Sequence, residues 1–433
     1  MRIETKLISF TLLFSVMLME AKLQIGEDFA SFRKMLFHYL FPQDSHVVRV
    51  RKLEEIQTVN NVTTLDFIGL VERYGYPAEE HYVTTEDGYN LVIHRMSGNP
   101  LSISQKKKTV VFFLGGLFCS SDIWVLVGPN KDLAFLLADE GYDVWLGNYR
   151  GNTYCRSHVK LSPQNKEFWQ FSHHEIGTRD LPAMIDYILN YTNQETMHSV
   201  SISMGGTVLF ILLSMKPEYN AKIKLGICFA PIAIWKEVSP AMKYLSNMTP
   251  SLKEIFDSNE IYEILTLTSM GIKMARTLCV DNTITQAVCV AAIYLLAGYD
   301  PVQLNTTMMP TIFSNYPAGS SVQLVDHYFQ NIIAKKFQAY DHGYFGNYKH
   351  YGQNTPIIYN LTKITAPMAI YYGNNDLIAT KANTLEIYKH LPNVILLEEN
   401  KLFNHFDFII AINAKTLVFD GIIELLQKFN NDL

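Results

Sequence analysis

Charged side chains are scarce in this sequence of 433 residues. They make up 18% of it, against a usual share of about 25%, while hydrophobic residues make up 48%. Such a chain buries a sizeable core, which excludes an intrinsically disordered protein. Neither sign of charge is in large excess, because 36 basic and 41 acidic residues leave a formal net charge of -5. Nucleic-acid binding depends on a basic surplus, so we expect no nucleic-acid partner.

Cysteine is also rare, and five copies are too few for the disulfide framework of a small secreted domain. The sequence has no metal-ligand spacing, no glycine loop that cradles phosphate and no dinucleotide-binding motif. We therefore expect neither a metal nor a cofactor.

No apolar run reaches the roughly 20 residues that a membrane span needs, and we expect no transmembrane anchor. The apolar run at residues 7–19 follows Arg2 and Lys6. This pattern predicts a secretory signal peptide over residues 1–21, cleaved after Ala21. The alternative is a buried first helix, because the two kinds of segment share their composition. The first interpretation predicts an exported protein.

An exported chain meets an oxidising compartment and the glycosylation machinery. Cys279 and Cys289 lie close together in one predicted helical region, and they are the pair that we expect to form a disulfide. Cys228 is interpreted as a small buried hydrophobe, while Cys119 and Cys155 stay unassigned. Asn-x-Ser/Thr triplets permit N-glycosylation at Asn61, Asn190, Asn247, Asn305 and Asn360.

Strand and helix patterns alternate along most of the chain. Two β-rich runs, 81–85 and 89–94, are separated by Asp87-Gly88, which predicts a hairpin. Further strands are predicted at 109–114, 142–146, 197–202 and 222–229, with helices between them at 132–140, 181–189 and 205–215. This alternation predicts the α/β fold class, with a mostly parallel sheet and helices on both faces.

The alternation stops between residues 231 and 354, where Met-, Tyr- and Leu-rich helical stretches carry few strand signals. It resumes with predicted strands at 368–372 and 394–397 around a helix at 381–390. We interpret 231–354 as an inserted helical cap or lid, which divides the α/β core into residues 67–230 and 355–433. Residues 22–66 form an N-terminal extension for which the sequence indicates no role.

A serine lies where the predicted strand 197–202 meets the predicted helix 205–215. The stretch Ser201-Ile-Ser-Met-Gly205 has the form small-x-Ser-x-Gly, which is typical of a nucleophile elbow. Small flanking residues let the chain turn sharply and hold Ser203 in a strained, exposed geometry. The alternative is an ordinary cap, because Ser-rich turns often begin helices. Ser203 is therefore a candidate nucleophile that needs partners elsewhere in the chain.

A serine becomes a nucleophile when a base takes its proton and an acid orients that base. In doubly wound hydrolases the chain order is Ser, then Asp or Glu, then His, each after a strand. Asp376 follows the predicted strand 368–372, and His405 follows the last predicted strand. Either residue alone would be an ordinary loop residue, but with Ser203 in this order they predict a catalytic triad. Asp407 is the rival acid, but it lies only two residues from His405, so we expect it to brace the loop.

The reaction also needs two backbone N–H groups that form an oxyanion hole. We expect them from Met204, directly after the serine, and from Leu117, on the loop that follows Gly115-Gly116. Glycines at this point let the backbone approach a bound acyl carbon. The alternative for the glycine pair is an ordinary turn after a strand.

From about residue 67 to the C-terminus the sequence resembles the acid lipase family, which includes gastric lipase and lysosomal acid lipase. The resemblance is carried by Tyr74-Gly-Tyr-Pro77, Thr85-Glu-Asp-Gly-Tyr89, Ser120-Ser-Asp-Ile-Trp124, Gly141-Tyr-Asp-Val-Trp-Leu-Gly-Asn148, Arg150-Gly-Asn-Thr-Tyr154, His174-Glu-Ile-Gly177, Asp180-Leu-Pro-Ala-Met184, Lys336-Phe-Gln-Ala-Tyr-Asp341 and His405-Phe-Asp-Phe408. It implies an α/β-hydrolase fold with a helical cap. It also implies Ser203 as nucleophile, Asp376 as acid, His405 as base and a disulfide between Cys279 and Cys289.

Two departures from the family pattern fall in the expected active site. The family usually has Gly-His-Ser-Gln-Gly at the elbow, where this chain has Ser201, Ile202 and Met204 around Ser203. It also usually has His-Gly before the oxyanion leucine, where this chain has Gly115-Gly116. Both expected oxyanion donors are backbone groups, so the departures bear on rate and substrate range.

The sequence thus predicts a serine ester hydrolase, a lipase that cleaves fatty-acyl esters through an acyl-enzyme. We expect a lipid ester substrate at an oil–water or membrane interface, and a secreted or lysosomal location. A cholesteryl ester hydrolase or a carboxylesterase is the neighbouring alternative. An alternative of a different class is a catalytically weakened lipase fold that binds or stores lipid, which the two departures favour.

Overall fold

The computed structural model describes residues 49–52, 64–99, 108–266, 275 and 277–431. The predicted signal peptide (1–21), most of the predicted extension (22–66) and the glycosylation triplet at Asn61 lie outside the described residues. The short strands β1 (Arg49–Val50) and β2 (Thr64–Leu65) pair in parallel and precede helix α4 (Phe67–Glu72).

A twisted sheet forms the centre of the molecule, with the strand order β13-β12-β9-β8-β5-β6-β4-β3 and β7 beside β4. Its strands are β3 (Ala78–Thr84), β4 (Tyr89–Met96), β5 (Val110–Leu114), β6 (Asp143–Gly147), β7 (Ser157–His158), β8 (Met197–Ile202), β9 (Ile223–Phe229), β12 (Met368–Gly373) and β13 (Val394–Asn400). Pairing is parallel from β13 to β6 and antiparallel from β6 to β3. The α/β class and the mostly parallel sheet are confirmed.

The middle strands are buried along their whole length, which explains their continuous apolar sequences. β5 reads Val-Val-Phe-Phe-Leu and β6 reads Asp-Val-Trp-Leu-Gly, with every position buried. A parallel sheet covered on both faces requires such runs. The hairpin of β3 and β4 turns at the predicted Asp87-Gly88, where Gly88 has a φ of 98°.

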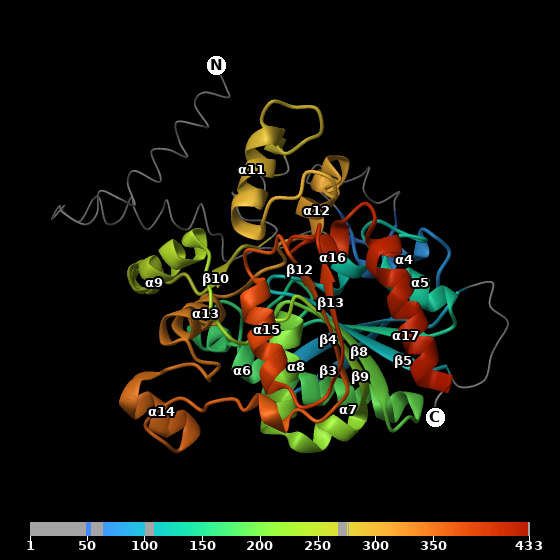
Figure 1. Cartoon of the computed structure of the whole chain (residues 1–433). Coiled ribbons are helices and arrows are strands. Elements are labelled where there is room, and N and C mark those ends of the chain that lie inside the picture. Colours follow the sequence, from blue (N-terminus) through green and yellow to red (C-terminus); the bar gives the residue numbers. More distant parts are fainter. Residues whose placement is uncertain (1–48, 53–63, 100–107, 267–274, 276, 432–433) are drawn as a thin grey trace.

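Helices cover both faces of the sheet, with α5 and α17 on one side and α7 and α8 on the other (Figure 1). The flanking helices are α5 (Leu133–Asp139), α7 (Leu181–Thr192), α8 (Met204–Met215), α15 (Lys381–His390) and α17 (Asp420–Asn431). α8 is buried along nearly its whole length, which its apolar sequence Val-Leu-Phe-Ile-Leu-Leu permits. This central helix begins directly after Ser203.

The chain between β9 and β12 is mostly helical. It forms α9 (Pro240–Ser258), α11 (Gln286–Ala297), α12 (Met309–Asn315), α13 (Val322–Ala334) and α14 (Gly343–Tyr351). The two-residue strands β10 (Glu263–Ile264) and β11 (Ser320–Ser321) pair within this part. α11 and α12 stand at the end of the molecule that also carries α16 (Asp407–Ile410) (Figure 1). Among the described residues, no helix has both the length and the apolar character that a bilayer crossing requires.

Candidate active site

Ser203 occupies a sharp turn between β8 and α8, with φ 54° and ψ -116°. A residue other than glycine rarely has a positive φ, and its strain is often found at functional sites. The turn brings α8 close to the neighbouring strand, because a Cβ on Gly205 would lie 2.4 Å from the Leu114 carbonyl oxygen. The geometry is that of a nucleophile elbow.

The departure at Ser201 is accommodated within the sheet. The Ser201 side chain is buried, and its hydroxyl donates to the Ile227 carbonyl of β9 at 3.2 Å. The added hydroxyl therefore has a partner, and the elbow keeps its sharp turn.

Three side chains from distant parts of the chain form one hydrogen-bonded row. Ser203 Oγ lies 2.9 Å from His405 Nε2, and His405 Nδ1 lies 2.8 Å from Asp376 Oδ2. A carboxylate only accepts hydrogen bonds, so Nδ1 carries the imidazole proton and Nε2 is free to accept from the serine hydroxyl. All three residues are buried, with 8%, 5% and 3% exposure for Ser203, His405 and Asp376. Such a row is arranged to move the serine proton onto His405.

The other carboxylate oxygen of Asp376 is held by the backbone. Its Oδ1 accepts from the N–H groups of Ile378 and Ala379, both at 2.8 Å. These bonds fix the carboxylate plane against His405. Asp407 contacts the base loop differently, because its Oδ2 accepts from the Asn404 N–H at 2.6 Å. The structure therefore places Asp376 beside the imidazole and uses Asp407 within the loop.

The two predicted oxyanion donors lie beside the serine. Met204 is the first residue of α8, and Leu117 follows Gly116, whose missing Cβ would lie 3.3 Å from Ser203 Cβ. Within the described part of the chain, no hydrogen bond uses the backbone N–H of Leu117 or of Met204. Two free donors next to a nucleophile are what a developing oxyanion requires.

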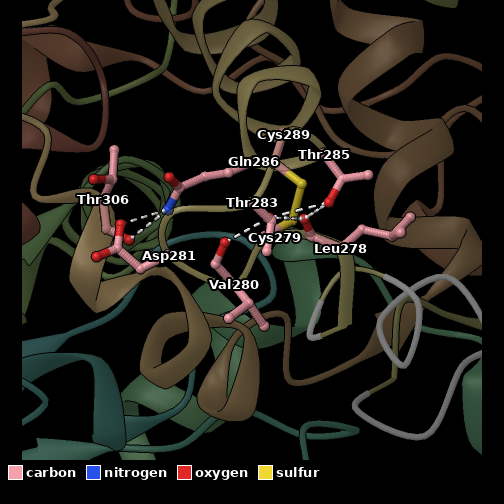
Figure 2. Close-up of a disulfide and its surroundings, with 9 residues drawn as sticks. All are labelled: Leu278, Cys279, Val280, Asp281, Thr283, Thr285, Gln286, Cys289 and Thr306. Carbon is pink, nitrogen blue, oxygen red and sulfur yellow. Dashed lines mark hydrogen bonds between the residues drawn. A yellow bond between two sulfur atoms is a disulfide. The ribbon is translucent and has the colours of Figure 1, made fainter.

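Cys279 and Cys289 form a disulfide with a Cα–Cα distance of 5.7 Å (Figure 2). It closes the turn that leads into α11, where Gln286 Nε2 donates to the Asp281 carboxylate and to the Thr306 carbonyl. The other three cysteines, Cys119, Cys155 and Cys228, are free and buried. Burial raises the pKa of the Cys119 and Cys228 thiols to about 12, so both stay protonated and unreactive.

The end of α11 contacts both loops of the row, and no sequence pattern predicts this contact. The Ala297 carbonyl accepts from the Leu377 N–H at 3.2 Å and from the His405 N–H at 3.3 Å. The next carbonyl, of Gly298, accepts from Asn404 Nδ2 at 3.1 Å. The one sequence signal at this point is the glycine after an apolar helix, which predicts only where the helix ends.

The four predicted glycosylation asparagines that the structure describes lie at or near the surface. Asn190, Asn247 and Asn360 are exposed, and Asn305 is half-buried. Their modification stays a prediction. Among the described residues, no group of three or more His, Cys, Asp or Glu side chains is arranged to hold a metal ion.

A mostly parallel sheet with a serine elbow, and with acid and base on loops after later strands, defines the α/β-hydrolase class. Residues 67–128 match the partial α/β-hydrolase lipase region, and residues 109–247 match the α/β hydrolase fold. A soluble variant of monoglyceride lipase from Saccharomyces cerevisiae, in complex with a substrate analog, has a TM-score of 0.50 at 14% identity. That comparison covers 82% of this chain and 96% of the other, and it concerns the fold alone.

Two relatives extend the likeness to sequence. Gastric triacylglycerol lipase from Homo sapiens is 37% identical over 367 residues, which cover 84% of this chain and 92% of the relative. Lipase 1 from Drosophila melanogaster is 35% identical over 382 residues, which cover 86% and 82%. The chain belongs to the acid lipase family, and it is a carboxylic ester hydrolase.

Proposed function

We propose that this lipase cleaves fatty-acyl esters of the triacylglycerol type through an acyl-enzyme, with Ser203 as nucleophile. The single observation that supports this most strongly is the row from Asp376 through His405 to Ser203, with contacts of 2.8 and 2.9 Å. The printed name of the relative, gastric triacylglycerol lipase, supports the substrate class.

The chemistry follows from the row. As Ser203 Oγ bonds to the acyl carbon, His405 Nε2 takes the serine proton, and the Asp376 carboxylate stabilises the imidazolium that forms. The carbonyl oxygen becomes an oxyanion between the N–H groups of Leu117 and Met204. When the ester C–O bond breaks, His405 returns the proton to the departing alcohol. Water then repeats the sequence on the acyl-enzyme and releases the fatty acid.

The surface of α11 supports a lipid substrate. Residues 282–299 contain no charged side chain, and α11 is apolar around its whole circumference. A helix of this kind is normally buried, yet Val288 and Leu295 are 69% and 67% exposed. We define the α11 surface as Ile284, Val288, Leu295, Leu296, Tyr299 and Val302. Twelve residues are too few to span a bilayer, so this surface suits the plane of an oil–water or membrane interface.

The remaining parts of the proposal concern the whole chain. Residues 231–354 act as the cap over the active site, and the segment 1–21 directs export to the extracellular space or the lysosome. The cap shields a long acyl chain from water, and its α11 surface meets the lipid phase.

Replacement of Ser203 by Ala tests the assignment of the nucleophile. We expect turnover of emulsified triacylglycerol to fall by a factor on the order of 10⁶, and labelling by a fluorophosphonate to disappear. Ser199→Ala is the matched control, because Ser199 is a buried serine of β8, the strand that ends just before Ser203, and its hydroxyl has no partner among the described residues. Retained turnover in Ser203→Ala would refute the proposal.

The substrate class needs its own comparison. Turnover of triacylglycerol emulsions, cholesteryl esters and short soluble esters by the wild type separates a lipase from a cholesteryl ester hydrolase and a carboxylesterase. A folded wild-type protein that takes up no fluorophosphonate would favour a lipid carrier instead.

A further inference from the structure

Two buried carboxyl groups face each other where the end of α11 meets the loop of His405. Asp300 follows α11, and Asp407 follows His405 by two residues; they are 2% and 0% exposed. The two chain segments run side by side beyond this point, because Ile412 N–H donates to the Gln303 carbonyl at 2.9 Å and Leu304 pairs with Ala411. The pair therefore lies inside the junction that also holds the His405 backbone.

Each carboxyl has one oxygen in use and one without a donor. Asp300 Oδ1 accepts from the N–H groups of Val302 and Gln303 at 3.0 and 3.1 Å. Asp407 Oδ2 accepts from the Asn404 N–H at 2.6 Å. Among the described residues, Asp300 Oδ2 and Asp407 Oδ1 find no donor group, and no cation forms an ion pair with either carboxyl.

These two unpartnered oxygens could satisfy each other only through a proton. Two ionised carboxylates offer only acceptors, so a hydrogen bond between Asp300 and Asp407 exists only when one of them is protonated. Burial, together with the nearby charges of Asp300 and Asp376, raises the pKa of Asp407 to about 8, although the Asn404 N–H opposes this. The proton therefore stays on Asp407 at neutral pH.

The other titratable groups around the pair do not supply a compensating charge. Tyr294, on α11, donates its hydroxyl to the Asp300 carbonyl at 3.0 Å, and burial raises the pKa of this phenol, so it stays neutral. Asp376 approaches from the acid loop and adds negative charge. On the same loop, Lys401 is exposed and forms no ion pair with either carboxyl in the described part of the chain, and the imidazole of His405 is engaged with Asp376 and Ser203.

We propose that Asp300 and Asp407 share one proton, and that this acid–carboxylate pair fastens the loop of His405 to the end of α11. Asp407 Oδ1–H donates to Asp300 Oδ2, which holds the His405 N–H on the Ala297 carbonyl. Both aspartates are positioning residues for the base, since neither contacts the reacting atoms. Loss of the shared proton leaves two facing negative charges, which separate the loop from α11 and displace His405 from Ser203. This inference rests on the proposed role of His405 in ester hydrolysis.

The consequence is an upper pH limit on activity. The shared proton is lost as pH rises through the folded-state value of about 8 for Asp407, which sets the alkaline side. The junction is therefore complete in neutral and mildly acidic solution.

The test compares pH profiles of kcat/KM on a short soluble ester for the wild type, Asp407→Asn and Asp300→Asn. In either variant an amide N–H replaces the shared proton and donates to the remaining carboxylate at every pH. We expect the wild type to lose activity about tenfold per pH unit well above pH 8. Both variants should keep activity there, with values near pH 6 within about threefold of the wild type.

Asp132→Asn is the matched control. Burial raises the pKa of Asp132 to about 8 as well, but its carboxylate accepts from the N–H groups of Val127 and Gly128 before α5, and neither contact involves the row. We expect this variant to keep the alkaline loss of the wild type. An unchanged alkaline loss in both Asp407→Asn and Asp300→Asn would overturn the proposal, and so would its removal by Asp132→Asn.

Amide hydrogen exchange separates this proposal from the proposed function. The protection factor of the His405 amide, which donates to Ala297, is measured for each protein near pH 6 and pH 9. We expect protection to fall about tenfold in the wild type and to stay constant in the two amide variants. A protein without ester turnover that shows this pattern would contradict only the proposed function. Constant protection in the wild type, in an active enzyme, would contradict the shared proton.

Discussion

A methyl group added at Gly298 should impair the catalytic row from a distance. Gly298 has a φ of 117°, and a Cβ there would lie 1.7 Å from the Asn375 carbonyl oxygen and 3.2 Å from Asn404 Cβ. Real Cβ atoms do not come closer than 3.0 Å to such an oxygen. In Gly298→Ala, the end of α11 and the loop that carries Asp376 must therefore separate by roughly 1 Å. A displacement of this size can lower the rate of an enzyme about 10²-fold.

The size of the effect follows from the position of the clash. Asn375 precedes Asp376, the proposed acid, and Asn404 precedes His405, the proposed base, so both residues are displaced together. A 10²-fold loss corresponds to about 2.7 kcal/mol of transition-state stabilisation. The strained φ adds a separate cost of about 1–3 kcal/mol to the free energy of folding.

The assay is kcat/KM on a soluble ester, corrected for the fraction of protein that a fluorophosphonate labels, together with thermal unfolding. Gly75→Ala is the matched control, because Gly75 has a φ of 80° with nothing within 4 Å of its missing Cβ. That variant has the backbone strain without the clash, and we expect lower stability with unchanged kcat/KM. A folded Gly298→Ala enzyme within about threefold of the wild type in kcat/KM would refute the reasoning.

Two further predictions concern stability and the lipid surface. Arg150 is 2% exposed and bonds to the carboxylates of Asp180 and Asp87, so Arg150→Met should lower the free energy of unfolding by about 3–5 kcal/mol in urea titrations. The double variant with Asp180→Asn should recover part of this loss, and a loss under about 1 kcal/mol would contradict the role of the ion pair. Val288→Glu should reduce turnover of triacylglycerol emulsions about tenfold, because a buried charge at an interface costs more than a kilocalorie, while soluble esters are cleaved as before. Val159 is 60% exposed and lies outside the α11 surface, so Val159→Glu should leave both activities unchanged. Equal effects of the two substitutions would argue against a role of the α11 surface in lipid binding.

The sheet and the order of the candidate residues could be predicted from the amino-acid sequence. Apolar runs of strand length alternate with helices, and a parallel sheet places all its strand ends at one edge. A serine after β8, an aspartate after β12 and a histidine after β13 were therefore expected to meet, and the structure brings them together. The positions of strands, helices and turns can be predicted in this way because they depend on short-range sequence patterns.

The tertiary structure alone decided which contacts complete the site. Asp376 and Asp407 both lie in the last part of the chain, near His405 in the predicted fold. Only the tertiary structure shows that Asp376 contacts His405, whereas Asp407 accepts from the Asn404 N–H. The same holds for Gly298, whose neighbour Asn375 is far away in the sequence. These contacts join segments that are far apart in the sequence, and neither segment carries a sequence pattern that identifies its partner. They arise because the end of α11 packs against the loops of Asp376 and His405, which lie far from it in the sequence.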